Sequence, residues 1–310
     1  MQKRSFSPIS NLVLALCLGH SLQASAASTP EKLASEFRAV IAKGDIDAAL
    51  TLGDFKNTHP TLEWTYLYFV TSCVYDAICS VSVKPDDAAS IAERTALQLN
   101  QGFEDGPKPE GLLVLTMVFK EPRASKIEHK IPFAKIAGQY RLVTGHYTAK
   151  KLTELHAQTD AQLLDAMFAA YPSNFRAGWK ADATVLPAGG GEIGTAYAAK
   201  VANDYERYHA GDVDGVIAHG NPTVQRMFAP KERDGTPVAK SFRALQARAD
   251  SVRMLVNIKI LGGYQLGDYV VLEIQGTAEN GWIERGPVIL GRDSDGKFVR
   301  LFDRTISYPK

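Results

Sequence analysis

The sequence predicts an α+β fold built from two similar halves, and three observations carry this prediction. In each half, apolar residues at helical spacing come first and residues at strand spacing follow. The motif GDIDAAL at 44–50 returns as GDVDGVI at 211–217, with its apolar positions at one constant offset. A stretch rich in glycine and proline at 171–194 separates the halves. The 310 residues are therefore enough for two domains of roughly 100 to 150 residues, each with its own hydrophobic core.

Residues 1–26 have the pattern of a signal peptide. Lys3 and Arg4 precede an apolar stretch at 12–22, and Ala24 to Ala26 offers a small-residue cleavage site. We expect the mature chain to begin near Ala27 and to be periplasmic or secreted.

A lipoprotein that begins at Cys17 is the alternative, although Leu16 stands where such a signal has a small residue. No other segment approaches the roughly 20 apolar residues that a membrane span requires. Removing residues 1–26 changes the formal charge from +1 to −1. Nucleic acid and anionic lipid attract proteins with a large positive charge, which this chain lacks, so neither is expected as a partner.

Two cysteines, Cys73 and Cys79, remain after the expected cleavage. They lie too far apart for a disulfide within one straight strand, so a bridge requires a turn between Val74 and Ile78. An exported protein permits that bridge. The alternative is a pair of small buried apolar residues. No metal is expected, because neither cysteine has a second ligand at zinc-like spacing.

The first half, residues 28–148, begins with helical signals. Ser28 or Thr29 can cap a helix that Gly44 ends, and Asp45 starts a second short helix. The aromatic stretch at 63–70 is expected in the core. A strand is expected at 95–102, followed by three strands within 111–148. The stretch at 112–119 is apolar at nearly every position, which predicts a strand that is covered on both faces.

Between the halves, residues 149–194 are expected to form a helix at 149–168 and then a linker. Gly189, Gly191 and Gly194 fit the spacing G-x-G-x-x-G of a dinucleotide site. That site requires a second parallel strand that ends in an acid, whereas Asp212 follows the next helix directly. We therefore interpret the glycines as a flexible hinge and expect no cofactor.

The second half, residues 195–310, repeats the order of elements. Apolar and aromatic residues from Tyr197 to Tyr208 mark one helical face, and Gly211 ends that helix. A short helix follows at 213–217. A strand alternates cleanly at 252–260, and three more strands are expected within 267–305.

This order, a long amphipathic helix, AGDVDGVIA and then a curled sheet, resembles the superfamily of nuclear transport factor two and ketosteroid isomerase. The resemblance covers most of 196–307 and, more weakly, 28–148. It implies two tandem cystatin-like α+β rolls, in each of which helices pack on a curved antiparallel sheet. In that superfamily the cone between helices and sheet can be a pocket.

Four residues of the second half are candidates for a pocket or binding site. Strand alternation can bring Glu273, Trp282, Glu284 and Arg300 to one side of the sheet. Desolvation in an apolar cone would make such a carboxylate a usable acid or base. The alternative is a solvated face on which Glu and Arg pair across strands. No histidine pair has metal-binding spacing.

The sequence contains no motif for a catalytic nucleophile, so a non-catalytic role is favoured. We expect an exported protein that binds a partner protein or a small apolar ligand. The alternatives are a pocket enzyme, isomerase-like or hydrolytic, that uses Glu273 or Glu284, and an immunity or inhibitor protein. A fold resemblance cannot choose among these, because one fold hosts many functions.

Overall fold

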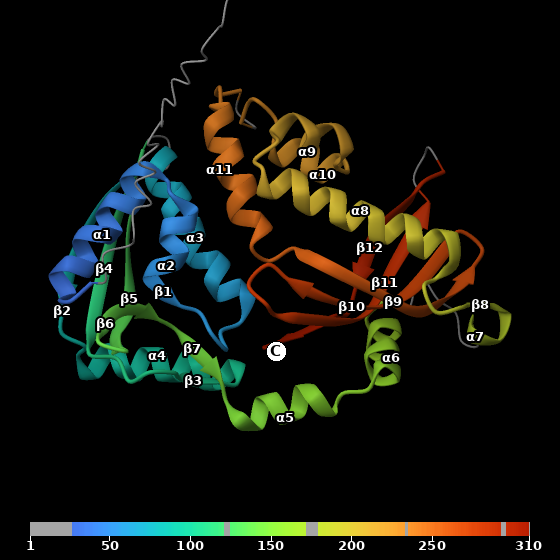
Figure 1. The fold of residues 1–310 in the computed structure, drawn as a ribbon, viewed down its shortest axis with the longest axis horizontal. Helices are drawn as coiled ribbons and strands as arrows, with labels where there is room; N and C mark the ends of the chain where they lie inside the picture. The colour runs from blue at the N-terminus through green and yellow to red at the C-terminus, as the bar shows by residue number, and fades with distance from the viewer. Residues whose placement is uncertain (1–26, 121–124, 172–178, 233–234, 293–295, 310) are drawn as a thin grey trace, which may run out of the picture.

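The computed structural model describes residues 27–309 apart from 121–124, 172–178, 233–234 and 293–295. The fold is mixed α+β with two curved, open sheets, one in each half of the chain (Figure 1). The expected signal peptide at 1–26, including Cys17 and the cleavage site near Ala26, lies outside the described residues.

The first half forms a five-stranded sheet in the order β1-β6-β5-β4-β2, in which β1 and β6 are parallel and the other neighbours antiparallel. Its β3 and β7 form a separate two-stranded ladder. The elements are α1 (Pro30–Lys43), α2 (Ile46–Leu52), β1 (Gly53–Asp54), α3 (Pro60–Tyr75), β2 (Ala77–Lys84), α4 (Ala88–Gln101), β3 (Phe103–Asp105), β4 (Gly111–Phe119), β5 (Lys126–Ile136), β6 (Gln139–Val143) and β7 (Gly145–Tyr147).

The rest of the chain forms a six-stranded antiparallel sheet in the order β12-β11-β10-β9-β8, and β13 pairs with the far end of β11. The elements are α5 (Ala149–Ala157), α6 (Asp160–Ala170), α7 (Trp179–Asp182), β8 (Thr184–Leu186), α8 (Gly191–His209), α9 (Val213–His219), α10 (Pro222–Met227), α11 (Lys240–Ser251), β9 (Leu255–Leu266), β10 (Tyr269–Ala278), β11 (Ile283–Arg292), β12 (Phe298–Asp303) and β13 (Ile306–Tyr308).

The repeated motif forms the same structure in both halves. Thr29 caps α1 by accepting from the backbone of Lys32, and Gly44 ends the helix in the left-handed conformation. Gly211 is likewise left-handed after α8. Asp45 and Asp212 then cap α2 and α9 through their side chains. The predicted helix boundaries at these positions are confirmed.

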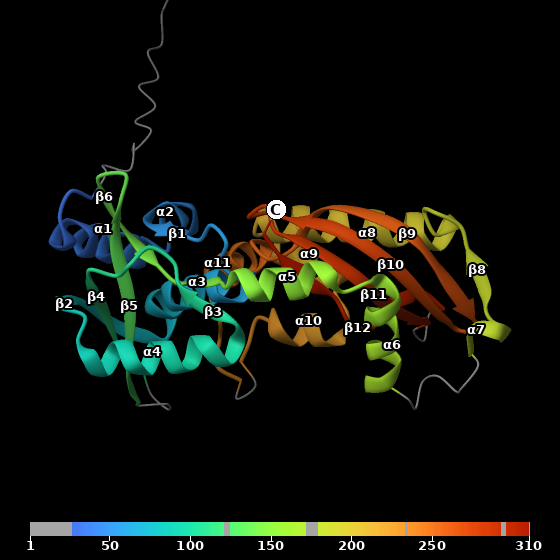
Figure 2. The same cartoon turned by 90° about the horizontal axis from the view of Figure 1, so that it is seen from below.

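The strand expected at 95–102 is wrong, because these residues belong to α4. Asp87 starts this helix by accepting from the backbone N–H of Ser90 at 2.7 Å. Ser90 is buried, and its hydroxyl accepts from Lys130 of β5. Since Lys130 lies opposite Val114 in the sheet, α4 runs along the face that turns away from α1 and α3 (Figure 2). It therefore helps to cover the second face of the apolar strand β4.

The two halves share their cores. The core of the first half, around Phe37, Leu67 and Leu115, includes Ala249 and Val252 from the end of α11. In Figure 1, α11 stands between α3 and α8, with α8 across one side of the second sheet. Neither set of core residues is therefore complete within its own half.

The segment expected to be a linker is largely part of the second half. The single helix expected at 149–168 is two helices, α5 and α6, because Thr159 and Gln162 form a capping box that starts a new helix. Met167 of α6 and Trp179 of α7 pack on the face of the second sheet opposite α8, and β8 adds an edge strand. This segment consequently contributes buried surface as well as a connection.

The glycine-rich turn joins β8 to α8. Gly189, Gly190 and Gly191 all have positive φ angles, of 86°, 67° and 62°. At Gly194 a Cβ atom would lie 2.1 Å from the carbonyl oxygen of Gly189. The N–H of Gly189 donates to Ile260 on β9, which holds the turn against the sheet. Since β8 runs antiparallel to β9, the parallel strands of a dinucleotide site are absent at this turn.

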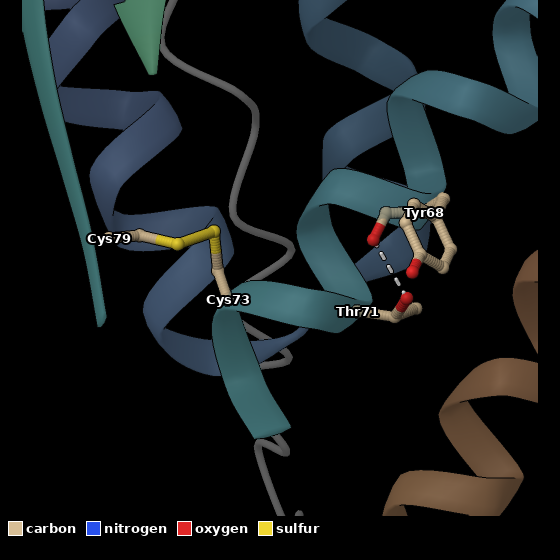
Figure 3. The surroundings of a disulfide bond; sticks show 4 residues. All are labelled: Tyr68, Thr71, Cys73 and Cys79. Atoms are coloured by element: carbon tan, nitrogen blue, oxygen red, sulfur yellow. Dashed lines mark hydrogen bonds between the residues drawn. A yellow bond between two sulfur atoms is a disulfide. The ribbon is translucent and has the colours of Figure 1, made fainter. Parts of the chain in front are cut away.

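Cys73 and Cys79 form the expected disulfide, with a Cα–Cα distance of 5.5 Å (Figure 3). Cys73 lies near the end of α3 and Cys79 on β2, so the bond ties a helix to an edge strand of the sheet. The turn that the spacing required is present, since α3 ends at Tyr75 and β2 begins at Ala77.

Candidate functional site

The four candidate residues of the second half lie on two faces of its sheet. Glu284 lies on the face that packs against α8, as do its strand neighbours Val288 and Leu290. Glu273 lies on the opposite face, with Val271 of the same strand. The expectation that all four gather on one side is therefore wrong for Glu273.

Glu284 and Arg300 form one pair on the α8 side. Arg300 Nη2 lies 3.8 Å from Glu284 Oε1 and 2.8 Å from Asp303 Oδ2. Burial raises the pKa of Glu284, and the positive charge of Arg300 opposes that shift. Burial also raises the pKa of Tyr197, which projects from α8. These contacts match the cross-strand pairing that the sequence offered as the alternative to a catalytic pocket.

Trp282 is buried, with 3% of its surface exposed, and belongs to the junction between the halves. Its ring centroid lies 5.6 Å from that of Tyr147 and 5.9 Å from that of His59. His59 caps α3 by accepting from the backbone of Thr61, and burial lowers its pKa. Trp282 is thus a packing residue between the second sheet and the β7 end of the first half.

Phe298, Arg300 and Phe302 are alternate residues of β12. In the structure Phe298 packs on the α8 side and Phe302 on the other side. A register shift between β11 and β12 separates Arg300 from Phe302 and reverses the faces.

The interior between α8 and the sheet is filled by side chains. Tyr197 is 7% exposed, and Leu272 and Val288 have no exposed surface. Two cavities in the described part of the chain are lined by other residues. Tyr197, Leu272 and Val288 therefore belong to one packed core between α8 and the sheet.

A groove of about 470 Å³ lies between α5, α6 and the turn that precedes β13. Its apolar lining residues are Leu155, Leu163, Ala166 and Ile306. Its polar lining residues are Lys151, Gln158, Gln162, Arg304 and Thr305. Its volume is within the range of roughly 300 to 1,000 Å³ that small-molecule sites occupy.

Local sequence signals and one ion pair set the walls of this groove. Thr148 caps α5 and Thr159 caps α6, so the chain turns at Gln158 between the two helices. Arg285 of β11 fixes that turn by donating to the carbonyl of Gln158 and to Asp160. The groove is therefore anchored to the second sheet.

One polar atom in the groove wall lacks a partner. The side-chain oxygen Oε1 of Gln158 is buried and accepts no hydrogen bond from the residues that the structure describes. An unsatisfied buried acceptor costs about 1 to 3 kcal/mol, so the turn at Gln158 carries a local cost in stability. Sequence reasoning missed this groove, and the T-x-x-Q capping signal at Thr159 is the feature that could have indicated its turn.

A second polar cluster lies where the first half meets the second. Arg248 of α11 donates to Glu279 at 2.7 Å and to Asp47 of α2 at 2.6 Å. Trp64 of α3 donates to Asp250 at 2.8 Å. This junction cluster connects elements that lie about two hundred residues apart in the sequence.

Glu63 is a second buried acid at this junction, with 4% of its surface exposed, against 8% for Asp250. Asn280 donates a hydrogen bond to its carboxylate. Burial raises the pKa of Glu63 to about 7; the bond from Asn280 opposes this shift and the nearby charge of Glu279 adds to it. The nearby cation Arg248 is paired with Glu279. Among the described residues, no cation forms an ion pair with the carboxylate of Glu63.

Within the described residues, no group of three or more His, Cys, Asp and Glu side chains is arranged to hold a metal ion. No helix among them is long and apolar enough to cross a membrane. Comparisons of the chain with protein-family models, with curated proteins and with solved structures found no match.

Proposed function

We propose that this protein is an exported, non-catalytic binding protein whose groove between α5, α6 and β13 holds a small ligand with an apolar body. The groove carries the proposal because its volume of about 470 Å³ is combined with an apolar lining and a few polar side chains. Export agrees with the signal-like N-terminus and with the Cys73–Cys79 bond, since disulfides persist in oxidising compartments.

The proposal includes a relationship of the second half to the nuclear transport factor two superfamily. The order of α8, α9, α11 and the meander β9 to β12 supports it. The first half is the more divergent partner, because α4 and the parallel pair β1–β6 depart from the expected order. Because side chains pack between α8 and the second sheet, we place the ligand in the groove between α5, α6 and β13.

A pocket enzyme is the second candidate function. Burial raises the pKa of Glu284 beside Tyr197 and Arg300, which is the environment of a carboxyl acid or base. Glu284 is already paired with Arg300 and lines neither of the two cavities described above, so we favour the binding role.

Titration with the neutral, fluorescent N-phenyl-1-naphthylamine tests the proposal. We expect saturable binding to the wild type and loss of at least about tenfold in affinity for Ala166→Trp, because the new ring fills the groove. Ala169→Trp is the matched control, since Ala169 is an exposed residue of the same helix that does not line the groove.

Thermal unfolding establishes that both variants are folded. Absence of saturable binding to the wild type, or equal affinity of the two tryptophan variants, would overturn the groove as the binding site.

A further inference from the structure

Arg304 presents an unpaired cation at the rim of the groove. Its guanidinium has no ion pair or hydrogen bond with the described residues, whereas the neighbouring Asp303 is held by Arg300 at 2.8 Å. A cation without a local partner favours an anionic ligand.

The backbone of Arg304 is fixed in place. Its N–H donates to the carbonyl of Pro287 at 3.0 Å. On the other side, the chain passes so close to Gly286 that a Cβ there would lie 2.6 Å from the carbonyl oxygen of Arg304. The side chain therefore starts from a preorganised turn, which lowers the entropic cost of binding.

Lys151 adds a second cation to the same groove. Its aliphatic stem packs over Gly102, where a Cβ would lie 2.9 Å from its Cγ atom. Its ammonium lies 3.9 Å from Glu154, and that carboxylate is also 4.0 Å from Lys150. Two lysines thus share one acid, and the surplus charge is positive.

Of the acids near the groove, Asp160 is bound by its own cation, Arg285. Glu284 and Asp303 share a single cation, Arg300. The lining of the groove therefore provides two cations, Arg304 and Lys151.

We infer that the groove selects a straight-chain carboxylate. The anionic head lies between Arg304 and Lys151, and the chain lies along Leu155, Leu163 and Ile306. This inference rests on the proposed function and adds the chemical class of its ligand. Charge-assisted hydrogen bonds to a carboxylate supply the selectivity, and the apolar wall supplies affinity that depends on chain length.

Calorimetric titration with decanoate and with decan-1-ol tests the inference, because the two share a chain and differ in charge. We expect decanoate to bind the wild type about tenfold more tightly than decan-1-ol. Arg304→Gln and Lys151→Gln are expected to remove most of this preference and to leave decan-1-ol binding unchanged.

Lys150→Gln is the matched control, because Lys150 shares Glu154 with Lys151 and does not line the groove. It is expected to retain the wild-type preference, and all variants are expected to keep the wild-type melting temperature.

Equal affinity for decanoate and decan-1-ol, or an equal effect of Lys150→Gln and Lys151→Gln, would overturn the carboxylate. Failure of both decyl compounds while N-phenyl-1-naphthylamine still binds would also overturn it and leave the groove in place. Failure of all three compounds would overturn the proposed function itself.

Discussion

The carboxyl group of Glu63 couples one residue to the stability of the whole chain. Its pKa is about 7 in the folded protein, against an ordinary value of 4.5. The folded state therefore keeps its proton at pH values where the unfolded state has released one. Below about pH 4.5 both states are protonated, and between about pH 4.5 and 7 rising pH favours unfolding.

Glu63→Gln removes this titration and keeps an acceptor for Asn280. We expect the variant to match the wild type near about pH 4 and to exceed its free energy of unfolding by about 3 kcal/mol near about pH 8. Urea unfolding at the two pH values measures both differences. A gain that is the same at both pH values would contradict ionisation of Glu63 as its cause.

At the scale of elements, the disulfide connects α3 to the edge strand β2 through a short loop. A loop of this length restricts the unfolded chain modestly, so the double variant Cys73→Ser/Cys79→Ser is expected to lose about 2 kcal/mol in free energy of unfolding. Denaturant unfolding with and without reductant checks this. Reductant should lower the wild type to the level of the variant and leave the variant unchanged.

The helix α4 shows how a short pattern can mislead at the element scale. Leu97 and Leu99 alternate with polar residues, which indicates a strand, yet the helix places Ser90, Arg94 and Gln98 toward the protein as its less exposed row. The Asp87 cap and the ion pair between Arg94 and Asp86 support the helix. The capping residue Asp87, which precedes the alternating leucines, is the better indicator of a helix at this position.

At the scale of the whole molecule, the halves are joined by a shared core and by Arg248. The side chain of Arg248 is 14% exposed and holds Glu279, itself 19% exposed, as well as the exposed Asp47. Removing a mostly buried cation leaves Glu279 without its main partner, while an exposed ion pair contributes little.

Arg248→Met is therefore expected to lower the free energy of unfolding by about 2 kcal/mol, and Asp47→Asn by less than about 0.5 kcal/mol. Hydrogen exchange should increase in α3 and α11 of the Arg248 variant before it increases in β4 and β5. Equal losses in the two variants would contradict the dominant role of the Glu279 pair.

Much of the fold could be predicted from local sequence signals. The capping residues, the left-handed glycines and the meander of the second half act within a few residues of the chain, so the sequence determined them directly. The cysteine spacing likewise required the turn that the structure contains.

Only the tertiary structure decided which faces meet. A register shift placed Phe302 away from Arg300, packing assigned α6 and α7 to the second sheet, and α11 completed the core of the first half. The groove also depends on tertiary contacts, because Lys151 of α5 and Arg304 of the turn before β13 lie far apart in sequence. Short-range patterns specify elements, whereas burial between distant elements selects their arrangement, and the candidate site depends on that arrangement.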